Sequence, residues 1–193
     1  MTTLSPPTVS TVDNRFSLLD LGDEAAVGVY EASLYRQFAP LLPHNPLIRD
    51  LWTWDHTRRR LRTRVPYASQ QVALLCDPVS GEILFSMAIN LDPMAQWQSG
   101  TYGFACPPHE EHACEILVVA GLHRPNLHGL FIIRRFIHGF IFRRLAQHGY
   151  AWAYATSADA VRAVYRRAGA QLLAERTLQG HRRTLMRWNV RQP

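Results

Sequence analysis

Hydrophobic residues recur at helical spacing in two segments of the first third of the chain. In residues 23–38 the apolar side chains lie three and four positions apart, and Asp23 stands where a helix N-cap is favoured. Asn45 and Pro46 form a second start signal, because Asn caps helices and Pro is tolerated in the first turn. The segment that follows them runs to Arg62. The pattern predicts two amphipathic helices, the second ending in a run of arginines.

Shorter apolar runs rich in strand-forming residues follow. Residues 70–76 and 83–91 flank the turn "DPVSGE", which predicts a β-hairpin. The segment "TYGFACP" (101–107) is a weaker strand candidate. The segment "CEILVVAGL" (114–122) is apolar throughout, which is typical of a strand buried on both faces.

In the second half of the chain, segments with helical hydrophobic spacing alternate with short strand-like apolar runs. Apolar residues spaced by three and four predict a long helix over residues 127–147 with a broad buried face, and Gly149 is a stop signal. A strand over 151–157, a helix over 158–170 ending at Gly169, and two terminal strands follow. This order predicts an α+β, or mixed α/β, domain over residues 15–193, preceded by a flexible arm over residues 1–14 that is rich in Ser, Thr and Pro.

Composition agrees with one globular domain. The chain has 193 residues, and 47% of them are apolar, enough for a core. Arginines interrupt every long apolar stretch, so no membrane span is expected, and the first residues do not resemble a signal peptide. The three cysteines, Cys76, Cys106 and Cys114, have no metal or disulfide spacing. We expect a cytoplasmic protein.

The net charge of +6 comes entirely from arginine, because the sequence contains no lysine. A basic protein favours acidic partners such as phosphates, an acidic carrier protein or RNA. The arginines at the end of the second predicted helix fit docking of an acyl carrier protein or a tRNA backbone, and they fit equally an ordinary solvated face. They are Arg58, Arg59, Arg60, Arg62 and Arg64.

The segment "HRPNLHG" (123–129) lies between the apolar run and the long helix. The first N–H groups of a helix are unpaired, and the helix dipole favours an anion beside them. Arg124 can add a charged contact, Asn126 can cap the helix, and Gly129 lets the backbone approach a ligand. The alternative is a plain strand-to-helix connection with a turn at Pro125.

Two motifs together resemble the GNAT superfamily of N-acyltransferases. The pyrophosphate loop of that family has the pattern Arg/Gln-x-x-Gly-x-Gly/Ala, and here Arg124 and Gly129 match while Leu127 replaces the middle glycine. Downstream, "SADAVRAVYRRAGA" is similar to the family segment that contains a tyrosine and a glycine, with Tyr165 and Gly169 in register. The resemblance covers residues 17–190. It implies the GNAT fold, a mostly antiparallel sheet that is splayed between its fourth and fifth strands and flanked by helices.

The resemblance also implies roles for individual residues. The pantetheine arm of an acyl donor would pair with the fourth strand, and a backbone N–H near Val119 would polarise the thioester carbonyl. Tyr165 occupies the position of the general acid, and its alternative is a core tyrosine. Glu115 would accept the proton of the amine, with His109 or His112 as substitutes. The alternative for Glu115 is a solvated residue at the strand end. The donor-binding residues implied are Leu117, Val118, Val119, Arg124, Asn126, His128 and Gly129.

Two further groups of residues attract attention. The segment "PPHEEHACE" (107–115) holds several possible metal ligands, but its two histidines lack a second cluster at ligand spacing, so no metal is expected. Trp52, Trp54 and Trp97 would border an acyl or acceptor pocket, or else pack in the core.

The sequence therefore predicts an N-acyltransferase that moves an acyl group from acyl-CoA to the primary amine of a small molecule by direct attack. Three alternatives remain open. They are an acyl-carrier-protein-dependent synthase of N-acyl amino acids or acyl-homoserine lactones, a transferase that uses aminoacyl-tRNA, and a non-catalytic binding module of the same fold. The acceptor, the acyl chain length and the oligomeric state are left open.

Overall fold

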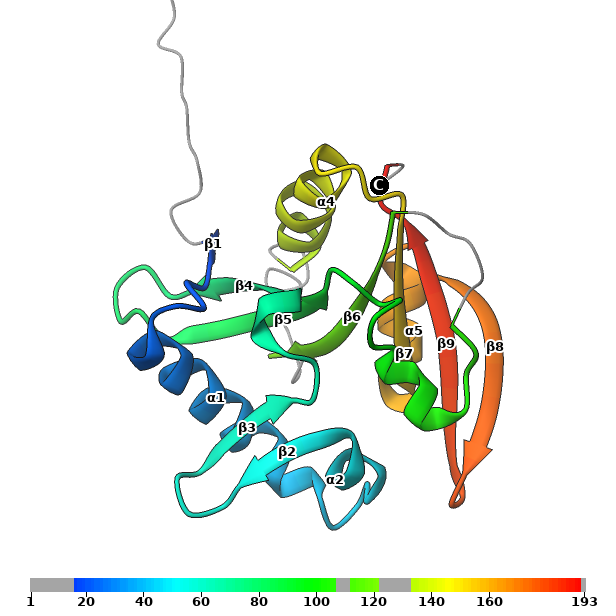
Figure 1. The fold of residues 1–193 in the computed structure, drawn as a ribbon, viewed down its shortest axis with the longest axis horizontal. Coiled ribbons are helices and arrows are strands. Elements are labelled where there is room, and N and C mark those ends of the chain that lie inside the picture. The colour runs from blue at the N-terminus through cyan, green and yellow to red at the C-terminus, as the bar shows by residue number, and fades with distance from the viewer. Residues whose placement is uncertain (1–15, 107–111, 122–132, 192–193) are drawn as a thin grey trace, which may run out of the picture.

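The computed structural model describes residues 16–106, 112–121 and 133–191. Their centre is a seven-stranded sheet with the strand order β1-β4-β5-β6-β7-β9-β8 (Figure 1). All neighbouring strands pair antiparallel except β6 and β7, which are parallel. The strands are β1 (Phe16–Leu18), β4 (Gln70–Cys76), β5 (Ile83–Asn90), β6 (Ala113–Ala120), β7 (Trp152–Ala158), β8 (Gln171–Leu178) and β9 (His181–Asn189).

Helical segments cover both faces of this sheet. On one face lie the π-helical η4 (Arg135–Phe142), α4 (Arg143–Gln147) and α5 (Asp159–Arg167), around a core that includes Phe136 and Phe142. On the other face lie α1 (Glu24–Phe38), the 3₁₀ helix η1 (Ala39–Leu41), α2 (Leu47–Leu51) and the 3₁₀ helix η3 (Gln98–Tyr102), around a core that includes Tyr30 and Leu117. In Figure 1, α4 stands above the sheet and α1 and α2 lie below it. A short 3₁₀ helix, η2 (Tyr67–Ser69), leads into β4.

Several sequence predictions are confirmed. Asp23 caps α1 by accepting hydrogen bonds from the N–H groups of Ala25 and Ala26. The hairpin is β4 and β5, and α5 is followed by Gly169 at a φ of +86°. The mixed α/β class is confirmed, with the strand, helix, strand, strand order of the C-terminal part as predicted.

The second predicted helix is wrong beyond Leu51. The chain leaves α2 there and forms a two-stranded sheet of β2 (Trp52–Asp55) and β3 (Arg60–Thr63). The carboxylate of Asp55 accepts a hydrogen bond from the N–H of Arg58, which stabilises the turn between the two strands. The arginine run therefore lies on a β-hairpin and not at the end of a helix.

Three smaller predictions also differ from the structure. The weak strand at 101–107 is replaced by η3, which begins at Gln98 and ends at Tyr102. Asn45 does not cap α2, because its side chain accepts a hydrogen bond from Arg183 instead. The short strand β1 was not predicted. The flexible arm predicted over residues 1–14 lies outside the described residues, and the predicted long helix is described only from Ile133 onward.

Candidate active site

β6 and β7 separate in the middle of the sheet. They pair from Ala113 with Trp152 to Ile116 with Ala155, and no pairing continues beyond that point in the described part of the two strands. Past it, β6 remains paired with β5 and β7 remains paired with β9. The sheet is thus open between residues 117–120 of β6 and residues 156–158 of β7, which confirms the predicted splay between these strands.

A β-bulge at Leu117 accompanies the separation. Ile116 lies opposite Ile89 of β5, whereas Val118 lies opposite Ala88, so Leu117 is the extra residue. The side-chain amide of Gln98 donates a hydrogen bond of 2.9 Å to the Leu117 carbonyl oxygen. η3, on which Gln98 lies, therefore holds the bulge in place.

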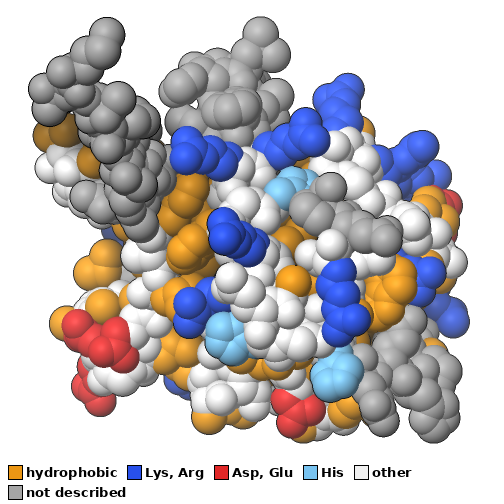
Figure 2. All heavy atoms as spheres, turned by 90° about the horizontal axis from the view of Figure 1, so that it is seen from above, with side chains coloured by type: hydrophobic (Ala, Val, Ile, Leu, Met, Phe, Trp, Pro, Cys, Tyr) orange, Lys and Arg blue, Asp and Glu red, His pale blue; other side chains and the backbone are white. Residues whose placement is uncertain are grey.

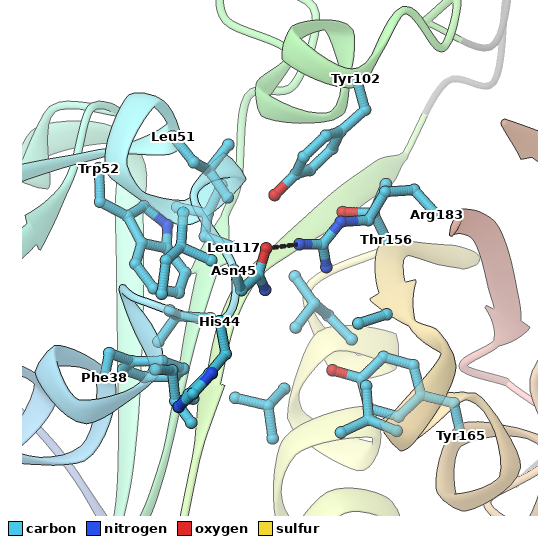
Figure 3. A pocket seen from close by; sticks show the side chains of 17 residues that line it. Phe38, His44, Asn45, Leu51, Trp52, Tyr102, Leu117, Thr156, Tyr165 and Arg183 are labelled. Atoms are coloured by element: carbon cyan, nitrogen blue, oxygen red, sulfur yellow. Dashed lines mark hydrogen bonds between the residues drawn. The ribbon is translucent and has the colours of Figure 1, made fainter. Parts of the chain in front are cut away.

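The opening holds a pocket of about 290 Å³. Helical segments before β2 form one wall, and β7, α5 and β9 form the other (Figure 3). Leu117, Val118 and Val119, which the resemblance implied as donor-binding residues, are among its lining residues. The other lining residues are Phe38, Leu41, His44, Asn45, Ile48, Leu51, Trp52, Tyr102, Ile116, Thr156, Ala158, Val161, Tyr165 and Arg183.

The pocket passes from one face of the sheet to the other. Leu117 and Tyr102 belong to the core on the α1 face, whereas Ile116 and Tyr165 belong to the core on the η4 face. Residues of both cores line the same pocket. The pocket therefore borders the side-chain layers on both faces of the sheet.

Tyr165 points its hydroxyl into the pocket from α5 (Figure 3). Its ring packs edge-on against Trp188, with ring centroids 5.2 Å apart, which fixes the orientation of the phenol. Burial raises the pKa of Tyr165 well above its ordinary value, so the hydroxyl keeps its proton at neutral pH. Tyr165 is therefore a neutral phenol that faces the pocket.

Glu115 is completely buried and does not line the pocket. Its carboxylate accepts hydrogen bonds from the N–H of Gln98 (2.9 Å), the N–H of Ser99 (2.7 Å) and the hydroxyl of Ser99 (2.6 Å). Burial raises its pKa, although these hydrogen bonds and one with Asn90 oppose the shift. Glu115 therefore anchors the first turn of η3.

The other candidate bases lie elsewhere. His112 is exposed just before the beginning of β6, beside Gly149 and away from the splayed end of the strand. His109 lies outside the described residues. Of the three tryptophans, Trp52 lines the pocket, whereas Trp54 donates to the carbonyl of Ile48 and Trp97 to that of Phe104.

Arg183, Asn45 and Tyr102 form a polar group that sequence reasoning missed. Arg183 comes from β9, donates a hydrogen bond of 2.8 Å to the side-chain oxygen of Asn45 and lies 5.0 Å above the ring of Tyr102. The phase of β9 does not single it out, because Arg183 shares a face with buried Leu185 and Arg182 shares a face with buried Met186. His44, which also lines the pocket, was missed as well.

The predicted phosphate-loop residues Arg124, Asn126, His128 and Gly129 lie outside the described residues. The helical segment that follows them, η4, packs its Phe136 and Ile137 into the core on the α5 side of the sheet. Gly121, the residue before the loop segment, has a φ of +95°, and a Cβ there would lie 2.2 Å from the carbonyl oxygen of Leu84. Only glycine fits this approach of β6 to β5 without a shift of the backbone.

The arginine hairpin is partly tied to the protein. Arg60 lies 3.9 Å from buried Glu31, which also accepts a hydrogen bond from Tyr67. Arg62 and Arg64 line a separate polar hollow of about 250 Å³. Figure 2 shows that cationic side chains are spread over one face of the molecule, with acidic side chains at its margins.

The described ranges contain neither a metal-binding group of side chains nor a membrane-spanning helix. Within them, no three His, Cys, Asp or Glu side chains lie together in a group that could hold a metal ion. No helix in these same ranges is both long and apolar enough to cross a bilayer. All three cysteines are free thiols.

No protein-family profile matches the sequence, and no curated protein matches it by sequence. Solved structures do match. TofI, in a ternary complex with an inhibitor and MTA, superposes with a TM-score of 0.68 at 12% identity, over 91% of each chain. A Desulfovibrio desulfuricans protein assigned to the GNAT family of acetyltransferases matches with a TM-score of 0.52 at 12% identity, over 91% of this chain and 99% of that one. The chain has the GNAT fold.

A third similar structure was solved with two bound ligands. BjaI, a CoA-dependent acyl-homoserine lactone synthase solved with SAM and isopentyl-CoA, matches with a TM-score of 0.61 at 9% identity, over 85% of this chain and 77% of that chain. The fold predicted from the two sequence motifs is thereby confirmed. Identities of 9 to 12% establish the fold and not the reaction, so the activity is argued from the pocket.

Proposed function

We propose that the protein is an N-acyltransferase that moves an acyl group from a phosphopantetheine thioester to the primary amine of a small molecule. The observation that carries the proposal is the open sheet. β6 ends its pairing with β7 at Ile116, and Leu117, Val118 and Val119 then line a pocket. The amide-rich pantetheine arm can pair with such a strand as an added strand does.

The reaction needs few protein groups. The amine nitrogen attacks the thioester carbonyl carbon, a C–N bond forms, the C–S bond breaks, and the amine loses a proton. The thiolate that leaves takes the proton of the Tyr165 hydroxyl, and the proton that the amine loses returns to the phenolate, so that one proton passes in total from nitrogen to sulfur. The part of the pocket around Tyr165 disfavours an anion, because burial raises the pKa of Tyr165. Passing the amine proton to the thiolate through Tyr165 therefore leaves neither an anionic sulfur nor a phenolate in this part of the pocket.

We assign Glu115 a positioning role. It does not line the pocket, so it acts on the reaction through η3, which carries Tyr102 into the lining and holds the bulge at Leu117 through Gln98. A backbone N–H near Val119 remains our candidate for polarising the thioester carbonyl. Arg124, Asn126, His128 and Gly129 remain our candidates for holding the phosphates of CoA.

The likeness to BjaI favours a second candidate, a synthase of the acyl-homoserine lactone type. The two compounds bound to BjaI, SAM and isopentyl-CoA, would fit the two-sided pocket as amine and thioester. The donor would be acyl-CoA or an acyl carrier protein, and the arginine hairpin with Arg58, Arg59, Arg60, Arg62 and Arg64 would be the docking surface for the latter. Both candidates share one test of the donor site.

The test is calorimetric titration of acetyl-CoA and octanoyl-CoA into the protein and two variants. Val161 lines the pocket from α5, whereas Ala163 is exposed on the same helix. Val161→Trp should fill the opening and weaken binding at least about tenfold, and Ala163→Trp should leave it unchanged. Equal binding by all three proteins, or no binding to the unmodified protein at moderate salt, would refute a CoA donor between β6 and β7.

A further inference from the structure

Arg183 is a buried cation without an acidic partner among the described residues. Arg183 is 6% exposed, and its side chain projects from β9 into the pocket (Figure 3). One terminal nitrogen donates to Asn45, but the Nε atom has no hydrogen-bond partner in the described part of the chain. No carboxylate in that part forms an ion pair with this guanidinium.

The neighbouring groups do not balance the charge. The side-chain oxygen of Asn45 is neutral, and the ring of Tyr102 offers a cation–π contact only. Asp159, adjacent in sequence to the strand partner of Arg183, is hydrogen-bonded by Arg182 at 2.8 Å and forms no ion pair with Arg183. Arg182 and Arg162 lower the pKa of Asp159, and the charge of Arg183 adds a smaller contribution in the same direction. A buried charge is retained only where something compensates it. A ligand that brings a negative group would supply the compensation.

The opposite wall of the pocket offers a second free donor. The indole N–H of Trp52 is buried without a partner among the described residues, and Trp52 is itself only 6% exposed. No aspartate or glutamate is among the described residues that line the pocket. Arg183 and Trp52 line opposite walls of the pocket, and each has a buried donor without a partner among the described residues.

The position of Arg183 separates a negative group bound there from the phosphates of the donor. Arg183 lies on the face of the sheet that carries Leu185 and Tyr102. The predicted phosphate loop precedes η4 in the sequence, and η4 packs on the opposite face together with Tyr165. A ligand group bound by Arg183 would therefore lie on the face of the sheet opposite η4.

We propose that Arg183 binds the carboxylate of the amine acceptor, so that the acceptor is an amino acid or an amine that retains an amino-acid carboxylate. The planar guanidinium and a carboxylate form paired hydrogen bonds, for which a lysine is a poor substitute. The assignment of this ligand as the acceptor rests on the proposed function. The carboxylate site itself can be tested without any acyl transfer.

The experiment titrates the protein alone with S-adenosylmethionine and the common L-amino acids, each compared with its decarboxylated amine. We expect at least one carboxylate-bearing amine to bind, and its decarboxylated counterpart to bind about 10- to 150-fold more weakly, the range for losing one hydrogen bond to a charged group. Equal binding of both members of each pair, or no binding by any carboxylate, would overturn the proposal.

Three variants locate the site. Arg183→Gln should abolish the preference for the carboxylate, Arg183→Lys should retain part of it, and Arg182→Gln, changed at the adjacent exposed arginine, should retain all of it. Arg183→Lys keeps the charge, and it replaces Arg183→Gln as the test if the glutamine variant unfolds at too low a temperature. Unchanged binding by both Arg183 variants would also overturn the proposal. A separate titration with octanoyl-CoA distinguishes the two ideas, because loss of donor binding would refute the transferase while leaving the carboxylate site intact.

Discussion

Replacing Glu115 by Gln tests how the pocket is supported. The carboxylate accepts three hydrogen bonds within η3, two of them from Ser99 at one oxygen and one from Gln98 at the other. A glutamine can keep the Ser99 bonds, but its NH₂ group would then face the N–H of Gln98. One hydrogen bond to a charged group is lost, and two buried donors are left unpaired. We expect Glu115→Gln to lower the free energy of unfolding by about 2–4 kcal/mol.

The pH dependence of this loss has a definite sign. Burial raises the pKa of Glu115 above its ordinary value of 4.5, so the folded state holds the proton more tightly than the unfolded state. The stability that this protonation contributes is complete below pH 4.5 and is lost as the pH rises through the raised pKa. Glutamine does not titrate. The deficit of Glu115→Gln relative to the unmodified protein should therefore shrink as the pH rises.

Urea unfolding between about pH 4.5 and 8 measures both effects. Glu82→Gln is the matched control, because Glu82 is exposed, and it should stay within about 0.5 kcal/mol of the unmodified protein at each pH. A deficit that grows with pH would mean that the folded protein prefers the ionised carboxylate. No deficit at any pH would mean that Glu115 does not anchor η3, and our positioning role for it would fail.

Two further variants test the proton donor and the end of β6. Tyr165→Phe should lower kcat about 10²- to 10⁴-fold without weakening octanoyl-CoA binding, as measured by thiol release with an acceptor from the panel, and an unchanged kcat would remove the general-acid role. Gly121→Ala should lower the free energy of unfolding by about 2–5 kcal/mol, because it adds a backbone clash to the strain of a positive φ. Gly81→Ala carries the same strain with nothing within 4 Å and should lose only about 1–2 kcal/mol, so equal losses in urea melts would show that the clash is relieved.

The elements with one clear period were predictable from the sequence. α1 and α5 each show a helical repeat with a recognisable end, Asp23 at the start of α1 and Gly169 after α5. The β4–β5 hairpin has an equally clear turn between its strands. In such segments local preference and tertiary packing agree, and the pattern of single residues is sufficient.

The segment 52–63 was not predictable in the same way. Ile48, Leu51 and Trp52 are buried at the spacing of three and four that suits a helix face, so the pattern does not mark the end of α2. The segment becomes a hairpin because β2 pairs with β3, Trp52 opposite Thr63. The hydrophobic spacing within one segment carries no information about this pairing. The predicted helix was therefore too long.

The site residues also fall into those that sequence could predict and those that it could not. Tyr165 and the strand residues Leu117, Val118 and Val119 came from motifs, and all four line the pocket. Arg183 and Asn45 share no motif, because they meet from elements at opposite ends of the chain. Arg182 and Arg183 are adjacent and alike in sequence, and only the fold buries one and exposes the other.

The two-sided pocket bears on the order of chemical events. A donor held between β6 and β7 on the η4 side and an acceptor held by Arg183 on the α1 side would meet where the sheet is open, at Leu117 and Tyr165. Neither would have to leave before the other enters, and holding both at once supplies the proximity that direct attack requires. None of the described lining residues is a cysteine or a serine that could store the acyl group between two half-reactions. The geometry thus favours a ternary complex in which the opening of one sheet brings the amine and the thioester together.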